Sequence, residues 1–240
     1  MFVAVAAVLA AACGGTSGTT GSGTPAKDLA DNGVAELSAA DILGKTKTAL
    51  TGATTVRISG TGFAEGGQIE MDFRFKGTEG GAGWGTFDGQ RVEMIRVGQT
   101  VYFKADEAFW SDMTGDADAA REIAGKYLKT GAADEPALKL LATFTDLSAF
   151  SSMFLTPDGG SYTKGERKQI RGIDAIGLVE SGPRGLTLYV AAQGPAYPLQ
   201  LVATKADDNG TLDFVDYGAP VQLDEPPADQ VVDLDEVTSG

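Results

Sequence analysis

Few side chains in this chain of 240 residues could carry out chemistry, because it has one cysteine, Cys13, and no histidine. Without histidine, the usual nucleophilic triads and histidine metal sites are excluded. No Gly-x-Ser-x-Gly sequence and no phosphate-binding glycine loop occurs either. Carboxylate pairs are the remaining catalytic option, and they could form in two acidic clusters: Asp112, Asp116 and Asp118, and Asp207 with Asp208.

Both acidic clusters are interpreted as solvated or helix-capping carboxylates. The first lacks the glycine and the terminal glutamate of a calcium-binding loop, and aspartate is a preferred residue at the start of a helix. Acidic residues within strand-like runs, such as Glu70 and Asp72, are explained by the solvent-exposed face of a sheet. The sequence therefore predicts a protein that is not an enzyme and that needs no metal and no cofactor.

The charge balance is strongly acidic, with 33 Asp and Glu against 19 Lys and Arg and a formal net charge of −14. Nucleic-acid binding is excluded, because it depends on clustered cations that displace phosphate counterions. An acidic surface favours solubility. The charged fraction of 22% and the hydrophobic fraction of 42% are typical of a globular protein.

The lone cysteine follows directly after an apolar run at residues 3–12. A bilayer-spanning helix needs about 20 apolar residues, so this shorter run is typical of an export signal. Residues 9–13, Leu-Ala-Ala-Ala-Cys, resemble a lipobox, although Ala10 stands where a larger aliphatic residue is usual. No Lys or Arg precedes the run, so we expect the start to be shortened. The sequence predicts a signal peptide at residues 1–12 and a lipid on Cys13.

The segment after Cys13 is composed almost entirely of Gly, Ser and Thr up to residue 24. Such a segment cannot bury enough apolar surface to offset its ordering entropy. We expect residues 13–36 to be the lipidated cysteine with a flexible tether, and residues 37–240 to be one domain. The lipid would hold a monomer at the extracytoplasmic face of the cell membrane, since two or more acyl chains give stable anchoring.

Hydrophobic periodicity predicts a helix, then strands, then helices, then strands again. Apolar residues recur at helical spacing over residues 38–50, and Ser38 is a suitable N-cap. From residue 54 the period changes to two, most clearly at 69–75, and short turns predict sequential antiparallel pairing through residue 104. Residues 106–154 are apolar and mostly helical, with a short strand predicted at 127–129. Further strands are predicted at 161–164, 168–170, 175–180, 186–190, 199–203 and around 212–214, before an acidic tail that we expect to run along the surface.

This order predicts the α+β class, with a curved antiparallel sheet covered on one face by helices. A sandwich of two sheets is the competing fold, and the apolar middle helices disfavour it. Bulky, flexible apolar side chains are predicted to face inward, where they could line a cavity between sheet and helices or fill a solid core. The candidate lining residues are Ile58, Met71, Phe73, Phe75, Met94, Phe103, Phe109, Phe144, Phe150, Met153, Phe154 and Leu188.

The order of several motifs resembles the LppX/LprAFG lipoproteins of actinobacterial envelopes, which share a fold with LolA-type lipoprotein carriers. No single motif is specific. The features that match are the cysteine with its tether, the first helix, the stretch 141–154 with Thr145-Asp146-Leu147, the segment Gly172-Ile173-Asp174, and the closing run at 216–221 with Pro226-Pro227. Family members often carry a basic residue where this chain has Ala219.

The resemblance implies a LolA-like half-barrel covered by helices, with a hydrophobic cavity for acyl chains. We therefore expect a membrane-anchored lipoprotein that binds or carries an acyl lipid or glycolipid in the cell envelope. The alternative is a non-enzymatic envelope interaction or sensor module with a filled core and an exposed apolar patch. The volume of any cavity between the sheet and the middle helices would separate these two hypotheses.

Overall fold

A single open, curved sheet forms the body of the protein in the computed structural model, which describes residues 30–64, 67–131, 136–157, 160–182, 184–205 and 208–233. Cys13, the expected signal peptide, most of the expected tether and Asp207 lie outside these residues. The strands are β1 Val56–Ala64, β2 Gly67–Lys76, β3 Gly80–Phe87, β4 Gln90–Val97, β5 Thr100–Lys104, β6 Tyr127–Gly131, β7 Tyr162–Ile170, β8 Ile173–Glu180, β9 Leu186–Ala191, β10 Pro198–Lys205, β11 Asp208–Val215 and β12 Val231–Asp233.

The sheet joins two antiparallel meanders edge to edge. Its order is β12-β6-β5-β4-β3-β2-β1-β11-β10-β9-β8-β7. Within β1–β6 and within β7–β11, strands that follow one another in sequence are neighbours, as predicted. The two halves meet where β1 pairs with β11, with Ile58 opposite Phe214. The strands form one sheet, so the competing sandwich is wrong and the α+β fold class is confirmed.

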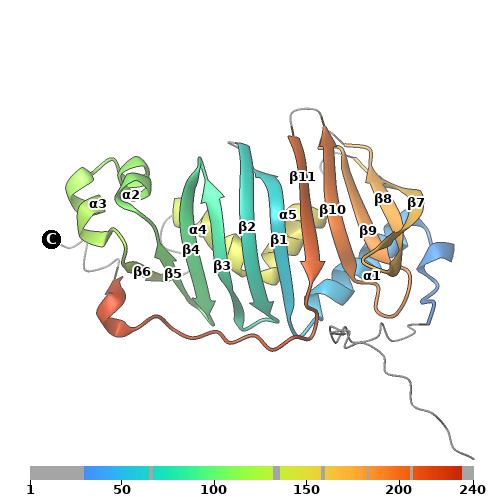
Figure 1. Ribbon diagram of the computed structural model, residues 1–240, viewed down its shortest axis with the longest axis horizontal. Helices are drawn as coiled ribbons and strands as arrows, with labels where there is room; N and C mark the ends of the chain where they lie inside the picture. The colour runs from blue at the N-terminus through green and yellow to red at the C-terminus, as the bar shows by residue number, and fades with distance from the viewer. Residues whose placement is uncertain are drawn as a thin grey trace, which may run out of the picture.

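Helices cover one face of this sheet, which we call the inner face (Figure 1). Ser38 begins α1 as predicted, because its hydroxyl oxygen accepts the N–H of Asp41 at 3.2 Å. Asp106, Asp116 and Asp146 cap the helices that begin at Glu107, Ala117 and Leu147 in the same way. The helices are α1 Ala39–Thr51, α2 Glu107–Thr114, α3 Ala117–Ile123, α4 Pro136–Ala142 and α5 Leu147–Leu155, with the 3₁₀ turns η1 Val34–Glu36, η2 Thr143–Thr145 and η3 Ala228–Gln230.

The fold differs from the sequence-based expectations in three places. Residues 31–36, expected in the tether, are held against the sheet, where Val34 is buried and the Asn32 amide donates to the carbonyls of Ala191 and Gly194 at 2.9 and 3.0 Å. The two strands expected at 161–164 and 168–170 are one strand, β7, with a register shift. The acidic tail runs along one end of the strands (Figure 1) and then forms β12, which pairs parallel to β6.

The core lies between the inner face and the helices and is rich in aromatic rings. Phe73 and Phe75 of β2 are fully buried, and their rings lie 6.2 Å from Phe144 and 5.7 Å from Phe150 respectively. Within the described residues no single helix is long and apolar enough to cross a membrane, although residues 138–145 and 147–155 reach that length and composition together, bent by 98°.

Candidate functional site

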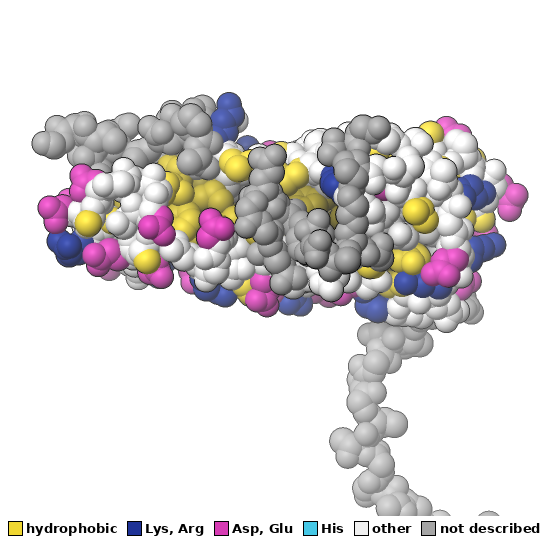
Figure 2. Space-filling view, turned by 90° about the horizontal axis from the view of Figure 1, so that it is seen from above, with side chains coloured by type: hydrophobic (Ala, Val, Ile, Leu, Met, Phe, Trp, Pro, Cys, Tyr) yellow, Lys and Arg dark blue, Asp and Glu magenta, His cyan; other side chains and the backbone are white. Residues whose placement is uncertain are grey.

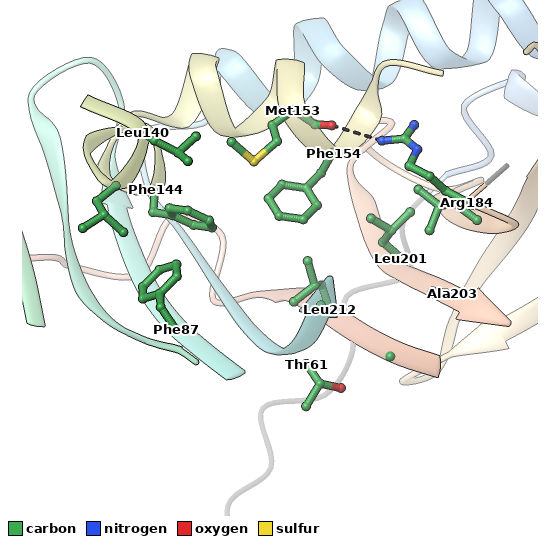
Figure 3. Close-up of a pocket in the computed structure, with 14 residues that line it drawn as sticks. Thr61, Phe87, Leu140, Phe144, Met153, Phe154, Arg184, Leu201, Ala203 and Leu212 are labelled. Atoms are coloured by element: carbon green, nitrogen blue, oxygen red, sulfur yellow. Dashed lines mark hydrogen bonds between the residues drawn. The ribbon is translucent and has the colours of Figure 1, made fainter. Parts of the chain in front are cut away.

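An apolar pocket of about 380 Å³ lies between the inner face and the segment α4–η2–α5, which we call the lid (Figure 3). Seen from above, hydrophobic side chains gather in a hollow on this side of the molecule (Figure 2). Strands from both halves of the sheet contribute, because β1 and β11 meet there. The lining residues are Thr61, Gly62, Phe87, Leu186, Leu201, Ala203, Gly210 and Leu212 from the sheet, Leu140, Leu141, Phe144, Met153 and Phe154 from the lid, and Arg184.

Asp146 fixes the first end of helix α5 in the lid. Its carboxylate accepts the N–H of Ala149 at 2.9 Å, which caps the helix, and pairs with Arg96 of β4 at 2.8 Å. This ion pair ties the lid to the sheet. The adjacent turn η2 carries Phe144, whose ring lies 5.3 Å from Phe87 in an edge-on arrangement. The lid is therefore seated by one polar contact and by aromatic packing beside it.

Arg184 fixes the other end of α5 and is the one charged residue among those that line the pocket. Its guanidinium donates to the backbone carbonyls of Met153, at 3.2 Å, and of Thr156. These carbonyls lie at the negative end of the helix, where a cation is favourable. The same guanidinium pairs with Glu180 at 2.6 Å, and the Glu180 side chain is completely buried. The pair leaves the described lining of the pocket without net charge.

Tyr162 lies next to this ion pair, opposite Glu180 in the register of β7 and β8. Burial raises the pKa of Tyr162 to about 12, and the charge of Glu180 adds to this rise while Arg184 opposes it. The hydroxyl has no hydrogen-bond partner among the described residues. Tyr162 is therefore a neutral, buried side chain at physiological pH.

Three of the twelve residues predicted to line a cavity do line this pocket: Phe144, Met153 and Phe154. The other nine are all buried in the main core cluster, and none of them borders the pocket. They are Ile58, Met71, Phe73, Phe75, Met94, Phe103, Phe109, Phe150 and Leu188. Ligand binding at any of the twelve stays a prediction.

The pocket lies where side chains on the inner face are small. Bulky apolar residues in the sequence therefore do not indicate its position. Gly62, Ala203 and Gly210 line it from β1, β10 and β11. A β-carbon added at Gly62 would lie 3.5 Å from the Leu212 side chain, an ordinary contact. Backbone geometry therefore does not require glycine at this position, and the missing side chain contributes to the open volume.

The first acidic cluster, Asp112, Asp116 and Asp118, has structural roles. Asp116 accepts the N–H groups of Asp118 and Ala119 at the start of α3. Asp118 pairs with Arg121 at 2.8 Å, and Asp112 accepts from the Gln90 amide at 2.9 Å. Within the described part of the chain, no group of three carboxylates is placed to hold a metal ion.

Comparison with known proteins finds the same fold in solved structures. No protein-family model and no curated protein matches the chain. LprF from Mycobacterium bovis is similar, with 17% identity and a TM-score of 0.50 over 78% of this chain and 96% of LprF. The lipoprotein LppX from Mycobacterium tuberculosis gives 15% identity and a TM-score of 0.46 over 78% of this chain and 98% of LppX. An uncharacterized conserved protein from Thermus thermophilus gives 13% identity and a TM-score of 0.43, over 81% of this chain and 98% of that protein. The likeness to LprF gives this chain the fold of the LppX/LprAFG-type lipoproteins, as the sequence predicts.

Proposed function

We propose that this chain is a membrane-anchored lipoprotein that binds or carries a hydrophobic ligand, an acyl lipid or a glycolipid, in the cell envelope. The observation that carries the proposal is the apolar pocket of about 380 Å³ beneath the lid. Thirteen of its fourteen lining residues are uncharged. Burial of an acyl chain there would contribute about 0.8 kcal/mol for each methylene group removed from water. The role is one of binding and has no catalytic step.

The place of action follows from the start of the sequence. A signal peptide at residues 1–12 would direct export, and acylated Cys13 would hold the domain at the extracytoplasmic face of the membrane. The segment up to residue 29 would then give the domain reach above the bilayer. Replacing Cys13 with Ser in the natural host should release the domain into the medium or leave the chain unprocessed. A Cys13→Ser chain that is still fully processed and membrane-bound would overturn the anchoring part of the proposal.

The alternative, an envelope interaction or sensor module, requires a filled core. The hollow beneath the lid supports ligand binding over that alternative. Leu140, 61% exposed, is an apolar lid residue on the surface, but it also lines the pocket and fits the ligand-binding proposal equally well.

The test is native mass spectrometry of the full-length Cys13→Ser chain, which has no covalent lipid of its own. Purified gently from cells with an envelope, the chain should carry a non-covalent lipid mass. After delipidation it should take up lipid from vesicles of total envelope lipid. A chain that carries no lipid and takes none up would refute the proposal.

A further inference from the structure

We infer that the pocket takes one acyl chain of about a dozen methylene groups and leaves the head group outside, so that the ligand is a single-chain amphiphile. This rests on the proposed function and narrows its ligand class. The first argument is volume. A methylene group needs about the space of a water molecule in the liquid, about 30 Å³. The pocket of about 380 Å³ therefore holds about a dozen methylene groups, and a second chain of that length would need twice the volume.

The second argument is that helix α5 of the lid is held at both ends. Asp146 pairs with Arg96 at the first end of α5, and Arg184 binds the carbonyls of Met153 and Thr156 at the last. The ring centroids of Phe150 and Phe154 lie 4.4 Å apart between these ends, in a stacked arrangement. Lifting α5 to admit a second chain would break these contacts together, so the α5 side of the pocket resists widening.

The third argument is charge. Among the described residues that line the pocket, Arg184 is the only cation, and the fully buried Glu180 already balances it. An anionic head group inside the pocket would lie close to the Glu180 carboxylate and to the carbonyl end of α5, without a cation of its own. Burial of an uncompensated charge is strongly unfavourable. The pocket therefore selects for chain length, and the head group stays in water.

The experiment is calorimetric titration of the full-length Cys13→Ser chain with lysophosphatidylcholines of 8 to 18 carbons, each below its micelle-forming concentration. Affinity should rise about four-fold with each added methylene and level off at about a dozen carbons. Dioctanoyl phosphatidylcholine, which has two short chains, should bind no more tightly than the eight-carbon single-chain lipid. Affinity that still rises at 18 carbons, or tight binding of the dioctanoyl lipid, would overturn the inference while leaving the proposed function intact. Absence of binding by every lipid would instead refute the proposed function.

Gly62→Leu tests whether this pocket is the place of binding. The new side chain adds four carbons to the pocket, and its β-carbon meets only the Leu212 side chain. The plateau should move to shorter lipids by about four methylene groups. Gly44→Leu, at an exposed position of α1 with open space around it, is the matched control and should leave the plateau unchanged. Ala203→Leu is a second pocket variant, used if Gly62→Leu does not fold by circular dichroism. A folded pocket variant with an unchanged plateau would contradict the inference.

Discussion

Phe144 joins the packing of the lid to the size of the pocket, so Phe144→Ala should change stability and ligand preference together. Its side chain is buried in the core, and its ring centroid lies 6.2 Å from Phe73, 5.3 Å from Phe87 and 6.4 Å from Phe154. Truncation of a buried phenylalanine to alanine costs about 3–5 kcal/mol. Because one side of Phe144 borders the pocket, that side has no packing to lose, and we expect a cost near 3 kcal/mol.

Urea unfolding followed by tryptophan fluorescence measures this cost, since Trp110 is almost completely buried and should report unfolding. A loss of about 3 kcal/mol should lower the urea midpoint without a change in slope. The same variant enlarges the pocket by six ring carbons. In the lipid titration, its affinity plateau should therefore move to longer chains by about six methylene groups.

Phe103→Ala is the matched control, because Phe103 is fully buried and does not line the pocket. It should cost about 4–5 kcal/mol and leave the chain-length plateau in place. Two results would refute the reasoning. One is a Phe144→Ala plateau identical to that of the parent chain. The other is an equal or larger stability loss in Phe144→Ala than in Phe103→Ala.

Three further predictions concern single sites. Tyr162→Phe should be nearly neutral at pH 7, because the hydroxyl has no hydrogen-bond partner among the described residues. The parent chain should lose about 2 kcal/mol more than this variant between pH 10 and 12. The folded-state pKa of Tyr162, about 12, lies above the unfolded value of 10.0, so the unfolded chain releases its proton first as the pH rises. Unfolding at both pH values tests this, and equal losses in the two chains would contradict it. Asp146→Ala should cost about 1 kcal/mol more than Asp146→Asn in thermal unfolding. Both variants lose the charge that faces Arg96, but Asn keeps the oxygen that caps the helix and Ala does not. Equal costs would show that the cap contributes little. Gly60→Ala should cost about 3 kcal/mol or more, because Gly60 has φ of 134° and an added β-carbon would overlap the Thr211 carbonyl. Gly62→Ala, two residues along the same strand, should change stability by less than about 0.5 kcal/mol. Similar costs for the two variants would contradict this geometry.

Local patterns in the sequence predict most of the helices and strands. Alternation at 69–75 predicts β2, and the cap at Ser38 predicts α1. Sequential pairing follows from short turns such as Asp88-Gly89. The pairing of β1 with β11 joins residues about 150 positions apart and has no local signal, and neither does the parallel pairing of the three-residue strand β12 with β6. Contacts of this kind depend on the whole sheet.

The site was harder to predict than the fold because a cavity forms where small residues leave space, and small residues give no pattern of their own. Inward alternation correctly identifies buried residues such as Phe73 and Met94, yet both pack inside the core. The pocket instead forms where Gly62 and Ala203 face residues of the lid. The sequence also does not indicate that Arg184 holds the lid. Its partners are backbone carbonyls of α5 and Glu180, whose side chain is buried only in the folded sheet. These contacts form only after the two meanders have paired through β1 and β11.

The pocket has a cost that a structural role alone does not explain. Unfilled apolar volume destabilises a fold by about 24 cal/mol per Å³ when it is enclosed, and domains of this kind have only about 5–15 kcal/mol of net stability. The chain leaves a partly open apolar pocket of about 380 Å³ while packing the adjacent rings of Phe73, Phe75 and Phe150 closely. Its described lining is mostly apolar, so it offers few partners for an ordered water cluster. Methylene groups match both the volume and the lining. A bound acyl chain would make the van der Waals contacts that the small residues Gly62 and Ala203 do not make.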